Sequence, residues 1–109
     1  MDGLLIDSEP LWLAAETEVM RRLGSEADWT ADDQHALLGG SLVKTVSYLL
    51  AKARRPQPPE VVADWLMGGI EDTVRRDGVP LRPGAAELLA AVASAGLSYA
   101  LVTSSERDL

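Results

Sequence analysis

Hydrophobic residues recur at steps of three and four along most of the chain, which is the period of an amphipathic helix. The first such stretch covers residues 8 or 9 to 23, where Ala15 and Val19 share one face and charged residues fill much of the rest. The same period predicts three further helices, over residues 31–38, 42–54 and 60–76. The middle of the chain is therefore predicted to be a region of four helices.

Residues that favour helix ends stand at the expected places between these stretches. Asp7 or Ser8 can cap the first helix, Thr30 begins a capping box, and Ser41 can cap the third helix. Gly68 and Gly69 lie inside the longest helix, where each costs about 1 kcal/mol relative to alanine. We expect close packing against a neighbour, or a bend, at these two glycines.

We expect a fifth helix over residues 87–95, and after it the sequence pattern is no longer helical. Residues 97–103 are short, apolar and rich in residues that favour strands, and polar hydroxyl residues follow them. This pattern predicts a buried parallel strand with hydroxyl groups at its carboxyl end. A parallel strand needs partner strands, so the pattern indicates an α/β core interrupted by a helical insert, of which this chain holds a minority.

The composition limits the possible partners. Ten basic and seventeen acidic residues give the 109-residue chain a formal net charge of −7. This charge argues against nucleic acid or an anionic membrane as a partner, whereas a phosphorylated small molecule needs only a local site. There is no cysteine, no signal peptide pattern and no apolar run of membrane-spanning length, so a cytoplasmic location is expected.

The opening residues 1–10 read Met-Asp-Gly-Leu-Leu-Ile-Asp-Ser-Glu-Pro, and residues 99–105 read Tyr-Ala-Leu-Val-Thr-Ser-Ser. The two segments resemble, in order, the end of the first motif and the second motif of the haloacid dehalogenase superfamily. The branch with a small helical cap fits best. The sequence of the opening residues is most similar to that of sugar- and hexitol-phosphate phosphatases such as 2-deoxyglucose-6-phosphatase. It is a little less similar to that of β-phosphoglucomutase-like enzymes.

The resemblance implies a role for four residues. Asp2 corresponds to the general acid/base, and its main-chain carbonyl corresponds to a ligand of Mg²⁺. Gly3 permits the tight turn beside the phosphate, while Thr103 and Ser104 correspond to groups that bind the phosphoryl oxygens. A phosphorylated small molecule is the implied substrate, and the implied reaction is hydrolysis of a phosphomonoester through an aspartyl-phosphate.

The resemblance also implies residues that the 109 residues do not include. The nucleophilic aspartate of the first motif would stand two positions before Asp2, and the lysine and paired acids of later motifs would follow Leu109. We therefore expect a chain cut at both ends, either trimmed or with a misassigned start, and inactive by itself. The alternatives are a non-catalytic helical binding module, or a parent enzyme of the β-phosphoglucomutase type.

The expected fold class is a fragment of a haloacid dehalogenase-like α/β (Rossmann-like) fold, made mostly of the α-helical cap. Residues 1–7 and 79–109 are expected to be core remnants, and residues 8–78 the cap. We expect the unpartnered strand near residues 98–103 to be disordered, irregular or paired with another copy of the chain. His35 is expected to be a surface or packing residue, and Trp12 is the tryptophan best placed to face a substrate.

Overall fold

The computed structural model describes residues 4–103. It contains the five predicted helices, with boundaries within three residues of the expected ones. They are α1 (Glu9–Arg22), α2 (Ala31–Leu37), α3 (Leu42–Ala51), α4 (Pro59–Asp77) and α5 (Ala85–Ser94), with a short 3₁₀ helix at Glu26–Asp28. The predicted helical region is confirmed.

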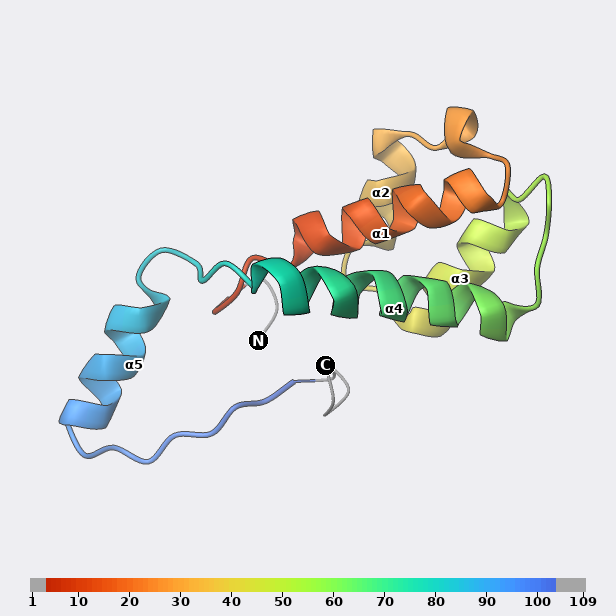
Figure 1. The fold of residues 1–109 in the computed structure, drawn as a ribbon. Coiled ribbons are helices and arrows are strands. Elements are labelled where there is room, and N and C mark those ends of the chain that lie inside the picture. Colours follow the sequence, from red (N-terminus) through yellow and green to blue (C-terminus); the bar gives the residue numbers. More distant parts are fainter. Residues whose placement is uncertain (1–3, 104–109) are drawn as a thin grey trace.

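Helices α1 to α4 pack together into one unit, which we call the helical body (Figure 1). Helices α1 and α4 run antiparallel beside each other, and α3 packs against α4. The apolar faces that the sequence pattern predicts meet in a core. Its fully buried side chains are Val19, Met20, Leu23, Leu49, Val62 and Leu66.

The two glycines in α4 differ in their surroundings. A Cβ added at Gly69 would lie 3.7 Å from the Ala15 Cβ of α1, at ordinary van der Waals distance, whereas one added at Gly68 would meet no atom within 4 Å. Of the two glycines, only Gly69 therefore packs against a neighbouring helix, at the place where α4 crosses α1.

Two of the three predicted caps are confirmed. The Thr30 hydroxyl accepts from the Asp33 backbone N–H and the Asp33 carboxylate accepts from the Thr30 backbone N–H, which completes the capping box. The Ser41 hydroxyl accepts from the Lys44 N–H at 3.2 Å. Ser8 occupies the cap position of α1, but its side chain makes no capping hydrogen bond because its backbone is already helical (φ −90°, ψ −12°).

The predicted strand at residues 97–103 is not present. The segment is extended but belongs to no strand, and Leu101 and Val102 are 61% and 82% exposed. Within residues 4–103 the only pairing of extended backbone is an isolated antiparallel bridge between Ile6 and Leu81. Without neighbouring strands the segment has no ladder to join. The prediction of a buried parallel strand is therefore wrong for this chain, and the irregular packing expected in the absence of partners is what the structure contains.

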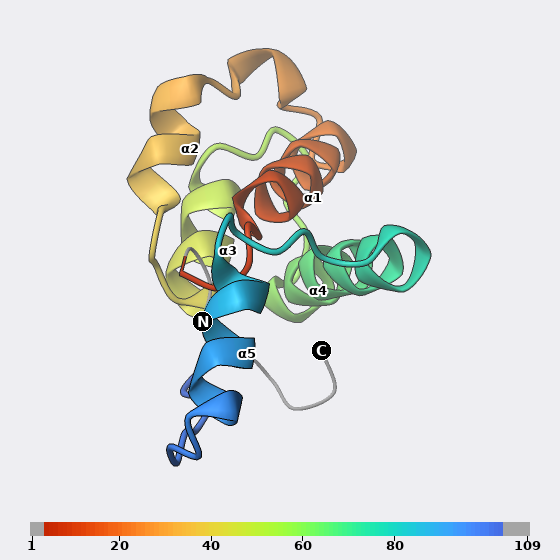
Figure 2. The same cartoon turned by 90° about the vertical axis from the view of Figure 1, so that its left-hand side faces the viewer.

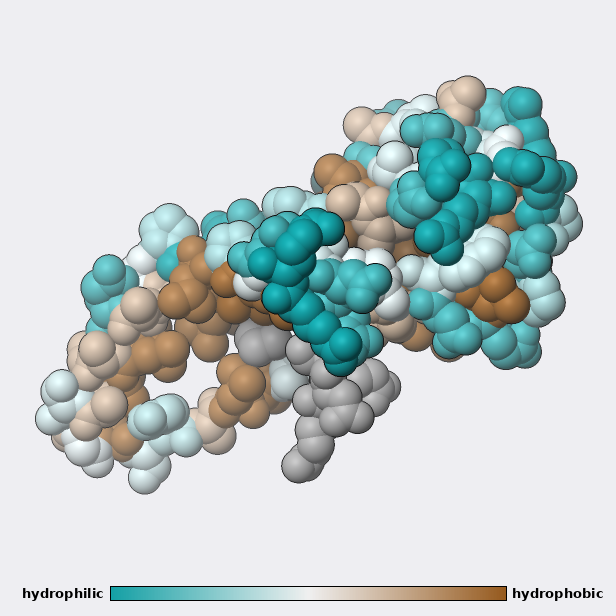
Figure 3. All heavy atoms as spheres, in the orientation of Figure 1, coloured by the Kyte–Doolittle hydropathy of each residue, from teal (hydrophilic) through white to brown (hydrophobic). Residues whose placement is uncertain are grey.

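Helix α5 and the segment that follows it project from the helical body (Figures 1 and 2). The described part of the molecule is elongated, with extents of 54 × 25 × 24 Å. Of the α5 residues only Ala85 is buried, and Leu88 and Leu89 are exposed. Hydrophobic side chains gather over α5 and residues 97–102 (Figure 3).

The two segments that enter and leave the helical body lie side by side. The Asp7 N–H donates to the Pro80 carbonyl at 2.9 Å, and the Arg82 N–H donates to the Leu5 carbonyl at 2.8 Å. These bonds flank the bridge between Ile6 and Leu81 and close the body at its base. They also fix the start of α1, from which the candidate site is built.

Candidate functional site

The structure describes only one of the four residues to which the resemblance gives a role. Thr103 is exposed and lies in the irregular segment after α5. Asp2, Gly3 and Ser104 lie outside the described residues. Their expected roles remain predictions.

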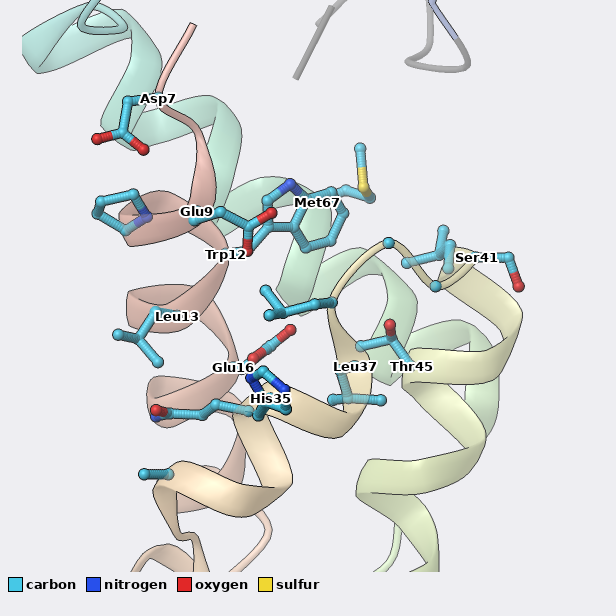
Figure 4. Close-up of a pocket in the computed structure, with 17 residues that line it drawn as sticks. Asp7, Glu9, Trp12, Leu13, Glu16, His35, Leu37, Ser41, Thr45 and Met67 are labelled. Carbon is cyan, nitrogen blue, oxygen red and sulfur yellow. The ribbon is translucent and has the colours of Figure 1, made fainter. Parts of the chain in front are cut away.

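A groove of about 770 Å³ opens between α1, α2 and the start of α3 (Figure 4). We call it the cap groove. Its hydrophobic lining includes Trp12, Leu37, Leu42 and Met67. Its polar lining consists of Asp7, Glu9, Glu16, Gln34, His35, Ser41 and Thr45. The groove thus combines an apolar wall with seven polar side chains, three of them acidic. A mixture of apolar and polar groups is usual in small-molecule sites.

The period of α1 places three side chains on the groove side of this helix. Glu9, Trp12 and Glu16 follow each other at steps of three and four residues, so they lie above one another on one face. Figure 4 shows all three pointing from α1 toward α2 and the loop before α3. Trp12 is half-buried and packs against the core, which leaves part of its ring facing the groove.

Glu16 is the most unusual of the polar residues that line the groove. Only 6% of the residue is exposed, although the side chain carries a carboxyl group. Burial, assisted by the nearby Glu9 carboxylate, raises the pKa of the Glu16 carboxyl to about 7. Within residues 4–103 it has no hydrogen-bond or ion-pair partner. Its carboxylate oxygens still reach the solvent of the groove, because among the described residues only Trp29 Nε1 is a fully buried side-chain polar atom without a hydrogen-bond partner.

A hydrogen-bonded cluster outside the groove joins α2 to the end of α3. The buried Asp33 carboxylate accepts from Lys52 Nζ at 2.5 Å and from the Tyr48 hydroxyl at 2.7 Å, and both of these residues belong to or follow α3. The same carboxylate closes the Thr30 capping box at the start of α2. Lys52 is the main reason that the pKa of Asp33 lies well below its usual range, and Tyr48 adds to the effect. The cluster therefore ties α2, which contributes to the groove lining, to α3.

The described residues do not form a metal site by themselves. No group of three acidic, histidine or cysteine side chains within residues 4–103 is arranged to hold a metal ion. The magnesium ligand implied by the resemblance, the main-chain carbonyl of Asp2, lies outside this range.

Comparison with known proteins identifies the family. The family model of haloacid dehalogenase-like hydrolases matches residues 1–109, which is the whole chain. The chain belongs to the haloacid dehalogenase-like hydrolase family. Hexitol phosphatase B of Escherichia coli strain K12 is 35% identical over 106 residues, and the protein of the same name in strain O157:H7 gives the same values.

The match covers 96% of this chain and 47% of each relative. The chain therefore spans about half the length of the curated relatives that it matches. The expected resemblance to hydrolases near the hexitol and sugar phosphatases is confirmed, and so is the fold class of a mainly helical part of a haloacid dehalogenase-like fold. Within residues 4–103 no helix has the length and apolar character needed to cross a membrane.

The groove includes residues that the sequence pattern did not single out, and Glu16 is the one with the largest change in environment. Glu16 looked like an ordinary solvent-facing position of an amphipathic helix, yet it lines the cap groove and is buried. The available signal was its spacing of four residues from Trp12, the tryptophan that was expected to face a substrate. His35 is exposed, as expected, and also lines the groove.

Proposed function

We propose that the protein to which this chain belongs hydrolyses a phosphomonoester of a sugar or hexitol through an aspartyl-phosphate. The observation that carries this proposal is the 35% identity to hexitol phosphatase B along nearly the whole chain. The cap groove supports it, because a groove that combines an aromatic side chain with polar groups suits a small hydroxylated substrate.

In this proposal the residues at the two ends of the chain perform the chemistry. Asp2 protonates the leaving oxygen of the ester and later accepts a proton from water. Thr103 and Ser104 donate hydrogen bonds to the phosphoryl oxygens, and Gly3 lets the backbone turn closely beside the phosphate. Dependence on Mg²⁺ belongs to the same proposal, and it predicts that chelation by EDTA abolishes activity and that added Mg²⁺ restores it.

We propose further that residues 8–78 act as a cap over the catalytic core, and that residues 1–7 and 79–109 belong to the core. The paired segments around Ile6 and Leu81 support this division, because the chain enters and leaves the helical body at one place. A body held by two adjacent linkers can move as a unit over a site at its base.

The test is a chimera in which these 109 residues replace the matched 106 residues of hexitol phosphatase B. We expect a folded chimera that hydrolyses sorbitol 6-phosphate with Mg²⁺ and loses activity at least a hundredfold on Asp2→Asn. Glu60→Asn, at an exposed acid at the start of α4, is the matched control and should leave the rate unchanged. A chimera that folds, by circular dichroism, but hydrolyses no phosphomonoester contradicts the proposal.

The 109-residue chain by itself should show no turnover of p-nitrophenyl phosphate with Mg²⁺. The reason is that its residues do not include the aspartate that the resemblance places two positions before Asp2 as nucleophile. Clear turnover that disappears on Asp2→Asn would show that the chain assembles a complete site in another way.

A further inference from the structure

Helix α2 is the most loosely packed helix of the helical body. The close helix pairs of the body are α1 with α4 and α3 with α4, and α2 belongs to neither pair. Figure 2 shows α2 at the edge of the body, apart from the other helices. With seven residues α2 is shorter than helices that are stable by themselves in water, so its position depends on contacts with the rest of the body.

Only two side chains of α2 are buried, and they hold the helix in different ways. Leu37 is part of the hydrophobic core. Asp33 is 4% exposed, and both oxygens of its carboxylate accept hydrogen bonds. Oδ1 accepts from the Tyr48 hydroxyl and from Lys52 Nζ, whereas Oδ2 accepts from the Thr30 N–H at 2.9 Å. We call the contacts of Asp33 with Tyr48 and Lys52 the Asp33 clamp, since they fasten α2 to α3.

The segments before and after α2 differ in how firmly they are held. Before α2, the Ser25 hydroxyl accepts from the Arg54 N–H at 2.9 Å, and Asp28 forms an ion pair with the Arg54 side chain at 2.8 Å. After α2, residues 38–40 are exposed, and Gly39 has φ +68° with no atom within 4 Å of the position of a Cβ. The chain can therefore bend after α2 while the segment before it stays in place.

The position of α2 determines the shape of the cap groove. Ala31, Gln34, His35 and Leu37 of α2 line the groove, and residues 38–41 continue this side of it (Figure 4). The opposite side belongs to α1, which is packed against α4 and does not depend on α2 for its place. A movement of α2 alone would thus open the groove without unfolding the helices on its other side.

We propose that α2 and residues 38–40 form a gate of the cap groove, which opens by local unfolding while α1, α3 and α4 stay folded, and that the Asp33 clamp holds the gate closed. Local opening requires less free energy than global unfolding where few buried contacts are broken. Here it breaks the clamp and exposes Leu37, but it leaves the packing of α1 against α4 intact. The gate is independent of the proposed function, and its tests need no catalysis.

Hydrogen exchange of backbone amides in low concentrations of urea tests the gate in the unmodified 109-residue chain. We expect the amides of residues 34–37 to be at least a hundredfold less protected than those of Leu66 and Ile70, which lie in the core of α4. Exchange in α2 should depend little on urea, because local opening exposes little surface. Equal protection and equal urea dependence in α2 and α4 would show that α2 opens only with the whole body, which overturns the inference.

Asp33→Asn tests the clamp, because it removes the charge that Lys52 and the Tyr48 hydroxyl bind. We expect the protection of residues 34–37 to fall at least tenfold further, while the NMR shifts of α1 and α4 remain helical. Lys52→Met should have a similar effect, and the double variant should lose less protection than the two single effects combined, since both break one contact. Asp32→Asn, at an exposed position in the same turn, is the matched control and should change the protection less than threefold.

Two results would overturn the role of the clamp. One is unchanged protection of α2 in both Asp33→Asn and Lys52→Met. The other is loss of the helical shifts of α1 and α4 together with those of α2 in Asp33→Asn, because the clamp would then hold the whole body and not a gate.

Discussion

Individual carboxyl groups in the helical body experience opposite environments. Glu16 is buried without a partner and its pKa is raised, whereas Asp33 is buried among hydrogen-bond donors and its pKa is lowered. Glu16 lines the cap groove from α1, whereas Asp33 lies on α2 outside the groove lining, so their effects on stability can be separated. Each acid changes the free energy of unfolding in its own pH range.

For Glu16 the sign of the pH dependence follows from the raised pKa. The folded chain binds the proton more tightly than the unfolded chain, so the free energy of unfolding falls as the pH rises from about 4.5 to about 7. Above pH 7 the cost of ionising Glu16 is fully present. We expect Glu16→Gln to stabilise the chain at pH 8 by on the order of 2 kcal/mol and to have little effect at pH 4.5. Urea denaturation at the two pH values measures this, and equal effects at both would contradict it.

Asp33 contributes in the opposite sense. Its lowered pKa means that the stabilisation is present above the unfolded value, near 3.8, and is lost as the pH falls below it toward the folded value. Asp33→Asn should remove the ion pair with Lys52 and weaken the capping box. We expect a lower melting temperature at pH 7 and a much smaller difference from the unmodified chain near pH 2. Asp32→Asn, at an exposed neighbour in the same helical turn, is the control for the charge at the helix start and should have the smaller effect at pH 7.

At the scale of elements, each helix is defined by local signals that agree with its packing. Thr30 and Ser41 cap α2 and α3, and the apolar faces of α1 and α4 meet at Ala15 and Gly69. This agreement between local preference and tertiary contact is a mark of a sequence that folds to one structure. Substitutions of glycines can test local backbone preference and tertiary contact separately.

Gly68→Ala and Gly84→Ala should have opposite effects on stability. Gly68 lies inside α4 with helical backbone and open space at its Cβ position, so alanine should stabilise by about 0.5–1 kcal/mol. Gly84 precedes α5 with φ +84°, which alanine adopts only with strain, so alanine should destabilise by about 1 kcal/mol. Thermal denaturation measures both. Destabilisation by Gly68→Ala would mean that α4 bends or packs there in a way that this structure does not contain.

At the scale of the whole molecule, the described chain is a well-packed helical body with an apolar extension that packs poorly. The core residues lie in α1, α3 and α4, with Leu37 from α2, whereas α5 and residues 97–102 expose most of their hydrophobic side chains. Exposed apolar segments of this size mark surfaces that other chains or domains cover. They also promote association of the chain with itself.

We therefore expect the 109-residue chain to self-associate through residues 97–102 as its concentration rises. Sedimentation of the chain between 5 and 500 μM tests this, and the double variant Leu101→Lys with Val102→Lys should shift the equilibrium to monomer because buried charges disfavour an apolar contact. Val43→Lys, at an exposed valine on α3, is the matched control and should leave association unchanged. A monomer across the whole range would contradict the expectation.

Local sequence signals were sufficient to predict the helices, two of their three caps and the family. These features depend on signals close together in the chain, such as the three- and four-residue period of α1 or the capping box at Thr30 and Asp33. The sequence motif in residues 1–10 is also a local signal, and it led to the family that the comparisons confirm.

The cap groove, the burial of Glu16 and the absence of a strand at residues 97–103 depend on tertiary contacts. Glu16 becomes buried because helices distant in sequence pack around it, which no pattern within α1 specifies. Residues 97–103 have the composition of a strand, but a strand forms only where neighbouring strands supply hydrogen bonds. Within residues 4–103 the only bridge joins Ile6 to Leu81 and does not involve this segment. Local preference sets what a segment can become, and non-local contacts decide whether it does.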